Sequence, residues 1–283
     1  MLDSIQDVLD AGDDRGPRFW RDPAMPHVES RRACDSRACY RPHSHPTWSI
    51  GAVDAGRSRF SAERVGTVPI GPGTLVFVPA GHVHACNPEP GVTWSYQMLH
   101  LDDHWVRRLL GMSGALKGDM QVLSATRVGL SNDPARYARF CVLNDLLFSA
   151  APVVDKEAAL RAFLVEGLVG TAAIEPLAQA MQSVPDILVP VMQRLEVAQE
   201  PVSLADLAVV AGMSRYRLIR VFRAATGMTP HAWWLNERVN QGRAHLRAGR
   251  SIAEVAHELG FSDQSHFQRM FKAHAGVTPG SYR

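Results

Sequence analysis

Residues 203–230 read SLADLAVVAGMSRYRLIRVFRAATGMTP, and residues 251–279 read SIAEVAHELGFSDQSHFQRMFKAHAGVTP. The two segments follow one pattern: the step from the first Ser to a Gly is nine residues in both, the step from a Phe to the next Gly is five, and the step from that Gly to a Pro is three. They differ only in the step from the first Gly to the Phe, which is ten residues in the first copy and eleven in the second. Such a repeat marks a structural unit that occurs twice.

Each copy predicts two helices joined by a tight turn, the helix-turn-helix arrangement. A Ser followed three residues later by an acidic residue is a capping box that starts a helix, and the two pairs are Ser203 with Asp206 and Ser251 with Glu254. Gly212 and Gly260 stand where the first helix must end, because Gly adopts a left-handed backbone at little cost. We expect the serines two residues later, Ser214 and Ser262, to cap the second helix.

The second helix of each copy has an apolar face and a basic face. At 100° per residue, the apolar face is predicted to hold Leu218, Val221, Phe222 and Ala225 in the first copy, and Phe267, Met270, Phe271 and His274 in the second. The opposite face holds Tyr216, Arg220 and Arg223, and then Ser265, Arg269 and Lys272. Charge on an amphipathic helix is most often simply solvated. The duplication and the aromatic side chain beside cations favour nucleic-acid binding instead.

The charge of the chain is distributed unevenly. Up to Pro185 the chain has 18 Lys and Arg against 20 Asp and Glu, whereas the remainder has 12 against 8, so the two parts carry about −2 and +4. This asymmetry agrees with a C-terminal part that meets a polyanion. The four cysteines, an acidic N-terminus without a signal-peptide core and the lack of an apolar run of about 18 residues predict a cytoplasmic protein that does not contact the membrane.

A long helix is expected between the two copies. Thr229 is a suitable cap, Pro230 suits the first helical position, and Gly249 suits the end. Such a helix of about 18 residues would be about 27 Å long. It could hold two recognition helices about one DNA turn apart, ~34 Å, on one face of the duplex.

These residues resemble the DNA-binding domain of the AraC/XylS family of bacterial transcription regulators. The resemblance covers about residues 186–283 and is carried by Ile252-Ala-Glu-Val-Ala256, Gly260-Phe-Ser262, Phe267, Phe271 and the ending Gly276-Val-Thr-Pro279-Gly-Ser-Tyr282-Arg283. It implies DNA contacts from the outward residues of both second helices, namely Arg215, Tyr216, Arg217, Ile219, Arg220, Gln264, Ser265, His266, Gln268 and Arg269. The basic faces of the same helices add Arg223 and Lys272 as expected DNA-binding residues. Ile219 departs from the usual polar choice and is expected to offer apolar contact, for instance to a thymine methyl group.

The N-terminal part has a different pattern of apolar and turn-forming residues. Residues 1–26 are expected to form a loose arm, and residues 27–102 contain short apolar runs broken by Gly and Pro, which predict a small β-sandwich or barrel. Helices are expected at 103–111, 134–150 and 155–174, and a linker near 177–184. The apolar stripe of the helix at 155–174 has two interpretations that remain open, packing against the barrel or a dimer contact.

Two histidine pairs, His43-Ser-His45 and His82-Val-His84, have strand spacing and could converge inside a barrel. The pattern resembles the cupin barrel, with Gly73-x5-Pro79-x-Gly81-x2-His84 as its second motif and Asn87 one place early. The Glu ligand is missing, since Trp48, Ser49 and Ile50 stand where it should be. The resemblance implies a metal site of His43, His45 and His84, with a divalent metal as the candidate cofactor, or an effector pocket of His43, His45, Trp48, His84, Trp94 and Tyr96.

The sequence therefore predicts a two-domain α+β protein without enzymatic activity: an arm (1–26), a cupin-like effector-binding barrel (27–128) with flanking helices, a helical region and linker (129–185), and an all-α DNA-binding domain (186–283). The expected function is transcription regulation in response to a small-molecule effector. Expected partners are operator DNA, a second copy in a homodimer and, for an activator, RNA polymerase. The alternatives are a metal-dependent cupin enzyme fused to a DNA-binding domain, and a ligand-independent regulator whose barrel only dimerises.

Overall fold

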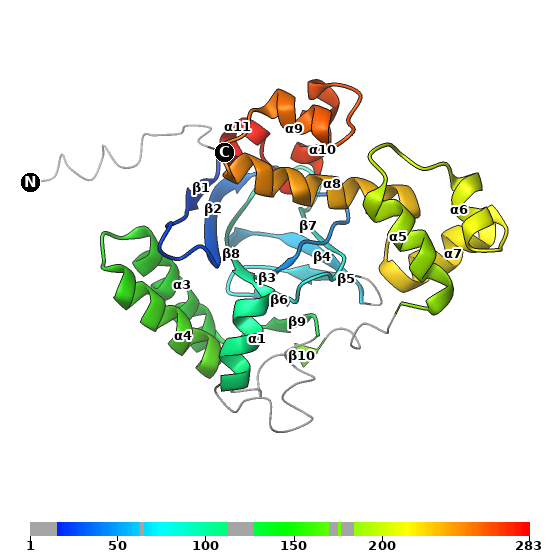
Figure 1. The fold of residues 1–283 in the computed structure, drawn as a ribbon. Coiled ribbons are helices and arrows are strands. Elements are labelled where there is room, and N and C mark those ends of the chain that lie inside the picture. Colours follow the sequence, from blue (N-terminus) through cyan, green and yellow to red (C-terminus); the bar gives the residue numbers. More distant parts are fainter. Residues whose placement is uncertain (1–15, 63–64, 113–126, 170–174, 177–183) are drawn as a thin grey trace, which may run out of the picture.

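A computed structural model describes residues 16–62, 65–112, 127–169, 175–176 and 184–283. A β-rich part with flanking helices is followed by an all-helical part that lies across one end of the sheets (Figure 1). The predicted two-domain α+β architecture is therefore confirmed. Within the described residues, no helix is long and apolar enough to cross a membrane.

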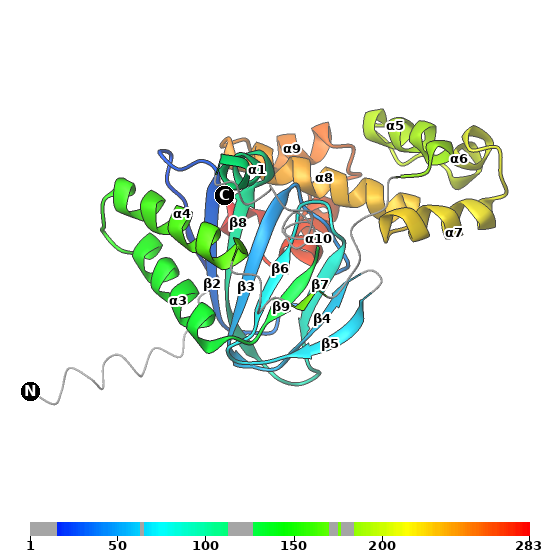
Figure 2. The same ribbon diagram turned by 90° about the horizontal axis from the view of Figure 1, so that it is seen from below.

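Two antiparallel sheets enclose the interior of the β-rich part (Figure 2). The larger has the order β1 (Arg18–Trp20), β2 (Val28–Ser36), β8 (Trp94–Asp102), β3 (Thr47–Gly56), β6 (Leu75–Val78), β9 (Gly129–Ser131) and β10 (Glu175–Pro176). The smaller has the order β5 (Gly66–Ile70), β4 (Ser58–Ala62) and β7 (His84–Pro88). Val53 and Trp94 of the larger sheet and Phe60 of the smaller share one buried core, as expected of a cupin-like barrel.

The outer face of the larger sheet is covered by three helices, α1 (Asp103–Met112), α3 (Pro134–Phe148) and α4 (Val153–Val169). Trp48 and Leu99 of the sheet pack with Phe140 of α3 and Leu160 of α4 in a second core. The apolar stripe of α4 is therefore used for packing within the chain. The part of this expected helix at 170–174, like most of the expected linker, lies outside the described residues.

Two boundaries differ from the expectation. Strand β1 lies in the segment expected to be a loose arm, where Phe19 pairs with Arg31 of β2. Strand β9 lies beyond the expected barrel, where Leu130 pairs with Val76 of β6. Both are three-residue strands, too short to show an alternating pattern in the sequence, and each gains its hydrogen bonds from the edge of a longer strand.

The C-terminal part consists of two helix-turn-helix units joined by a long helix, α8 (Pro230–Arg247). After a short 3-10 turn (Asp186–Leu188), the first unit holds α5 (Val189–Val197), α6 (Leu204–Val210) and α7 (Arg215–Thr226). The second holds α9 (Ile252–Glu258), α10 (Gln264–Ala275) and α11 (Pro279–Tyr282). Phe222 of the first unit packs on Trp233 near the start of α8, and Phe267 of the second lies against Gly242 in its later half. The predicted 18-residue connecting helix is confirmed.

Four of the five expected helix caps and one of the two expected capping boxes are confirmed. Ser203, Ser214, Thr229 and Ser251 each accept a backbone N–H at the start of their helix, and Ser251 forms the complete capping box with Glu254. Asp206 does not complete a box at Ser203, because its carboxylate accepts from the Ser203 hydroxyl. Ser262 does not cap α10; the cap is Asp263, whose side chain accepts from the backbone N–H of His266 at 2.7 Å. The second copy has one more residue between its Gly and Phe, and this residue lengthens the turn, so the second helix starts one position later.

Candidate DNA-binding surface and effector cavity

The outward face of α7 is basic and open to solvent. Arg215, Arg217 and Arg220 are exposed, and Tyr216 is 77% exposed, which is unusual for a large aromatic side chain. Arg223 is also exposed, while Ile219 is half-buried. The core face is as the sequence predicts, with Leu218 and Phe222 fully buried.

The outward face of α10 repeats this arrangement. Gln264, Ser265, Arg269 and Lys272 are exposed, and His266 and Gln268 are half-buried. His266 is held at the helix start, where its Nδ1 lies 3.1 Å from Oγ of Ser262. Figure 1 shows the two units on different stretches of α8, so the chain presents two basic helices rather than one. Arg and small polar groups at a helix start are the side chains that reach base edges in the major groove.

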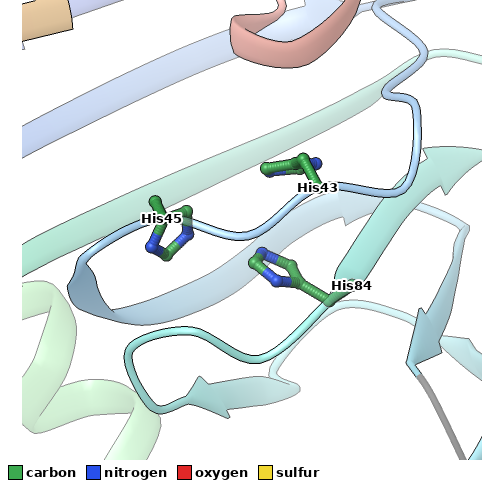
Figure 3. A group of neighbouring side chains, drawn as sticks. All are labelled: His43, His45 and His84. Atoms are coloured by element: carbon green, nitrogen blue, oxygen red, sulfur yellow. The ribbon is translucent and has the colours of Figure 1, made fainter. Parts of the chain in front are cut away.

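The predicted histidines converge at the mouth of the barrel (Figure 3). His43 and His45 come from the loop before β3, and His84 is the first residue of β7. The backbones of His43 and His84 are joined by two hydrogen bonds of 3.0 and 2.9 Å. All three side chains are buried, and one nitrogen from each lies within 4.8 Å of the others. His82 lies in the preceding turn and is not part of this group.

Burial lowers the pKa of all three imidazoles, that of His84 to about 4. The cluster is therefore neutral near pH 7, because desolvation disfavours the protonated form. The neighbouring cation Arg243, on α8, lowers the three pKa values further. A side chain of the DNA-binding part thus acts directly on the histidines of the barrel.

A cavity continues from the histidines to the DNA-binding part. A space of about 40 Å³ is lined by the three histidines together with Arg31, Tyr40, Cys86, Trp94, Tyr96, Met98, His100, Arg243, His274 and Ala275. Beside it lies a space of about 120 Å³, to which Arg31, His45, His100 and Arg243 also contribute. The barrel interior below is nearly filled, with about 20 Å³ left among apolar side chains. The cavity therefore has a polar end at the junction of the two parts and an apolar end inside the barrel.

Two arginines from different parts of the chain, the buried Arg31 and the half-buried Arg243, line both polar spaces. Arg31 of β2 donates to the hydroxyl of Tyr40 at 3.0 Å and to the carbonyl of Ala275 at 2.8 Å. Arg243 of α8 has one bond, of 3.3 Å, to the carbonyl of His274. In the described part of the chain neither forms an ion pair, and the Nε of each has no acceptor. Glu29 lines the larger space, but it is held by Arg21 at 2.6 Å.

The loop that carries His43 and His45 is fastened to α8. Ser44 donates its backbone N–H to the amide oxygen of Asn236 at 3.1 Å, and Asn236 donates back to the Ser44 hydroxyl at 3.1 Å. Asn240 donates to the Ser44 carbonyl at 3.0 Å. The C-terminal end of α10 is held as well, since the N–H of Arg41 donates to the carbonyl of Ala273 at 2.9 Å. These hydrogen bonds connect the loop to the DNA-binding part, so a movement of the loop would strain or displace α8 and α10.

The structure brings together five of the six residues expected to form the pocket. Trp48 is the exception: it lies in the core between sheet and helices, where its indole N–H donates to Asp103 at 2.6 Å. Side chains at alternate positions of a strand face opposite ways. Trp48 of β3 pairs with Leu101 of β8, and both face the helices, whereas Trp94 and Tyr96 lie at the other alternate positions of β8 and face the cavity. The sequence reasoning missed Arg31, His100 and Arg243, because only the pairing of β2 with β8 and the docking of α8 place them there.

The metal that the cupin resemblance implies would have three of its four ligands. His43, His45 and His84 are present in a suitable arrangement, and no carboxylate joins them among the described residues. At the position of the missing Glu, Ser49 places its hydroxyl 3.4 Å from Nε2 of His45. The donor set therefore fits a three-histidine site with an open position.

Comparisons with known proteins agree with both parts of the fold. A model of the AraC-like ligand-binding domain matches residues 26–164, and a model of a helix-turn-helix domain matches residues 207–283. The uncharacterized regulator YbfI of Bacillus subtilis is 27% identical over 250 residues, 87% of each chain. The transcriptional activator NphR of Rhodococcus sp is 34% identical over 121 residues, which are 42% of this chain and 35% of NphR.

Among solved structures, ToxT of Vibrio cholerae has a similar fold, with a TM-score of 0.57 and 14% identity over 90% of this chain and 97% of ToxT. The ligand-binding model covers the barrel and its helices, and the helix-turn-helix model covers most of the duplicated region. The chain belongs to the AraC/XylS family of transcription regulators.

Proposed function

We propose that this chain is a regulator whose effector is a small carboxylate bound in the cavity between the barrel and α8. The observation that carries the proposal is the pair Arg31 and Arg243, a buried and a half-buried cation from different parts of the chain that face one cavity. Among the described residues neither forms an ion pair, since Glu29, the carboxylate in the same lining, is bound by Arg21. Removing a cation from water without an ion pair costs free energy, and an anionic ligand between the two guanidinium groups would offset that cost.

The size of the cavity limits the effector. The two adjoining spaces, of about 120 and about 40 Å³, are together about as large as an apolar cavity of about 150 Å³ that accommodates benzene. An acid of roughly benzoate size, with its carboxylate at the arginines, is the class that fits best. Solved structures of ToxT are described as bound to an unsaturated fatty acid and to a naphthalenyl butenoic acid, which are also carboxylic acids.

The effector would act on DNA binding through the loop 41–46 and α8. A carboxylate between Arg31 and Arg243 would pull α8 toward the barrel, and Asn236 and Asn240 would transmit any movement of Ser44. Such differential contacts in two states of the chain are what allosteric coupling requires. The DNA contacts would come from the outward residues of α7 and α10, with Arg220 and Arg269 at base edges.

The remaining partners follow from this function. We place the protein in the cytoplasm with the chromosome and assign it no enzymatic activity. A homodimer would bring together two chains on neighbouring half-sites, and an activator would contact RNA polymerase.

The test measures affinity for an operator fragment with and without small acids of benzoate size, each paired with its neutral amide. We expect one of the acids to change the affinity by about 5–150-fold, the usual range of allosteric coupling, and its amide to have no effect. Arg31→Gln and Arg243→Gln should each abolish this response. Arg32→Gln is the matched control, because Arg32 also lies on β2 but pairs at the surface with Asp145. An amide as active as its acid, or a full response in Arg243→Gln, would contradict the proposal.

A further inference from the structure

The two helix-turn-helix units are attached to the barrel differently. The second unit lies directly over the end of the sheets, whereas α5, α6 and α7 of the first extend away from them (Figure 1, Figure 2). Arg31 of β2 donates to the carbonyl of Ala275 at the end of α10, and Arg21 donates to the carbonyl of Tyr282 in α11 at 2.7 Å. Part of the barrel therefore lies next to α10, one of the two helices expected to enter the major groove of DNA.

The loop that joins β2 to β3 contacts one side of α10. The backbone N–H of Arg41 donates to the carbonyl of Ala273 at 2.9 Å, and Nη1 of Arg41 lies 4.0 Å from the sulfur of Met270. At about 100° per residue, Ala273 lies roughly 40° from Arg269 around the helix axis, and Met270 lies roughly 100° from it. Arg41 is therefore at the edge of the face that carries Arg269, about one turn further along the helix.

The guanidinium group of Arg41 is exposed and forms no ion pair with any residue that the structure describes. Its one polar contact among those residues is the sulfur of Met270, which is a weak acceptor. Residues 36–53 include Arg37 and Arg41 but no acidic residue, so this stretch of chain offers no carboxylate either. An exposed arginine is most often only solvated. This one lies beside a surface that approaches a polyanion.

The backbone of Arg41 is held on both sides along the chain. Before it, the hydroxyl of Tyr40 packs so closely on Gly276 that a Cβ added at Gly276 would collide with it. After it, Ser44 is bound to Asn236 of α8. The backbone of Arg41 is therefore ordered before DNA binds, so only side-chain freedom is lost when its guanidinium group meets a ligand.

We propose that Arg41 contacts a phosphate of the DNA backbone beside the bases that α10 reads, so that the effector-binding barrel is itself part of the DNA interface. Arginine suits this role because the planar fork of N–H donors matches phosphate oxygens. Such a contact carries no sequence information, and its strength falls with salt because it depends on the release of counterions from DNA. The proposal rests on DNA binding through α10 and is independent of the chemistry of the effector.

The experiment measures the dissociation constant of the full chain at several salt concentrations on two duplexes, a genomic fragment that the purified chain retains and a scrambled duplex of the same length. One phosphate contact contributes about 0.9 to the slope of log K against log salt concentration. Arg41→Gln should reduce the slope by about this amount, which corresponds to about eight-fold weaker binding at about 0.1 M salt if the two chains bind equally at about 1 M. The loss should be similar on both duplexes, because both offer phosphates.

Two further variants separate a DNA contact from a structural role. Arg41→Lys keeps the charge and should keep the wild-type slope. Arg57→Gln should keep it as well: Arg57 is another exposed arginine of the barrel, but it precedes Ser58, at the end of β4 opposite to the end that pairs with His84. A side chain that only stabilised the end of α10 would lower the midpoint of urea unfolding when replaced and leave the slope unchanged.

An unchanged slope in Arg41→Gln overturns the proposal, whatever happens to its stability, and so does an equal reduction in Arg57→Gln. A wild-type chain that binds neither duplex would contradict DNA binding as a whole, and this contact with it. The failure of the contact is therefore distinguishable from the failure of the function on which it rests.

Discussion

The two turn glycines of the helix-turn-helix units occupy equivalent positions but have different surroundings. Gly212 and Gly260 both have a left-handed backbone, with φ of +60° and +73°. A Cβ added at Gly212 would have no heavy atom within 4 Å, whereas one added at Gly260 would lie 1.7 Å from the carbonyl oxygen of Gln199. Replacing each with Ala therefore compares the same strained conformation with and without a backbone clash.

The magnitudes follow from these distances. A left-handed conformation costs an Ala about 1–2 kcal/mol, and this is the whole expected effect of Gly212→Ala. Gly260→Ala adds overpacking of about 1–3 kcal/mol, because the backbone at Gln199 must move by more than an ångström. That segment is tied to α8, since the carbonyl of Ala198 accepts from the indole of Trp234 at 3.0 Å and from Arg238.

The assay is urea unfolding of both variants, followed by far-UV circular dichroism, which reports mainly on helices. Gly260→Ala should have the lower midpoint, by an amount that corresponds to the extra 1–3 kcal/mol, and the larger loss of DNA affinity because the clash displaces the first unit from α8. Equal destabilisation by the two substitutions would refute the reasoning. It would mean that the contact between Gly260 and the segment before α6 is absent in solution.

Three further predictions concern the DNA-binding part. Arg220→Ala and Arg269→Ala should each cost about 1–3 kcal/mol in operator binding and relax the preference at one base pair, and the two base pairs should lie ~10 bp apart. If competition assays show equal weakening on all sequences, the two arginines contact phosphates and not base edges. Asp263→Ala should lower stability by about 1 kcal/mol and Ser262→Ala by much less, and the reverse order in thermal melts would contradict the assigned cap. Asn236→Ala should leave effector binding intact and reduce its effect on operator affinity; an unchanged effect would exclude the Ser44 contact as a route of coupling.

The DNA-binding part was largely predictable because its signals are local. Caps, turn glycines and the apolar face of each helix lie within a few residues of one another, and the repeat doubles every signal. The exception, Asp263, was missed because the second copy was aligned with the first despite its extra residue. Local rules give no warning when an insertion moves a helix start by one position.

The cavity was only partly predictable. His43, His45 and His84 stand out through their spacing, but no pattern marks Arg31 as facing the cavity. Its neighbour Arg32 has the same charge and lies half-buried against α3, where it contacts Asp145 and the ring of Phe148. Nothing in the sequence distinguishes Arg243 from the other residues of the connecting helix. Its place in the cavity lining depends on how that helix packs against the barrel. Contacts between elements distant in the chain decide both positions, and a single sequence does not encode them in any local pattern.

The central claim is that this chain binds DNA sequence-specifically, and the most direct test is one affinity ratio. Fragments of the encoding genome that the purified chain retains are sequenced. The ratio is the dissociation constant for a scrambled fragment divided by the dissociation constant for the most enriched fragment, both measured at the same salt concentration. We predict a ratio on the order of 1000 or more, as expected for specific recognition. A ratio near one would show that the basic faces of α7 and α10 bind only the phosphate backbone, and would contradict the account.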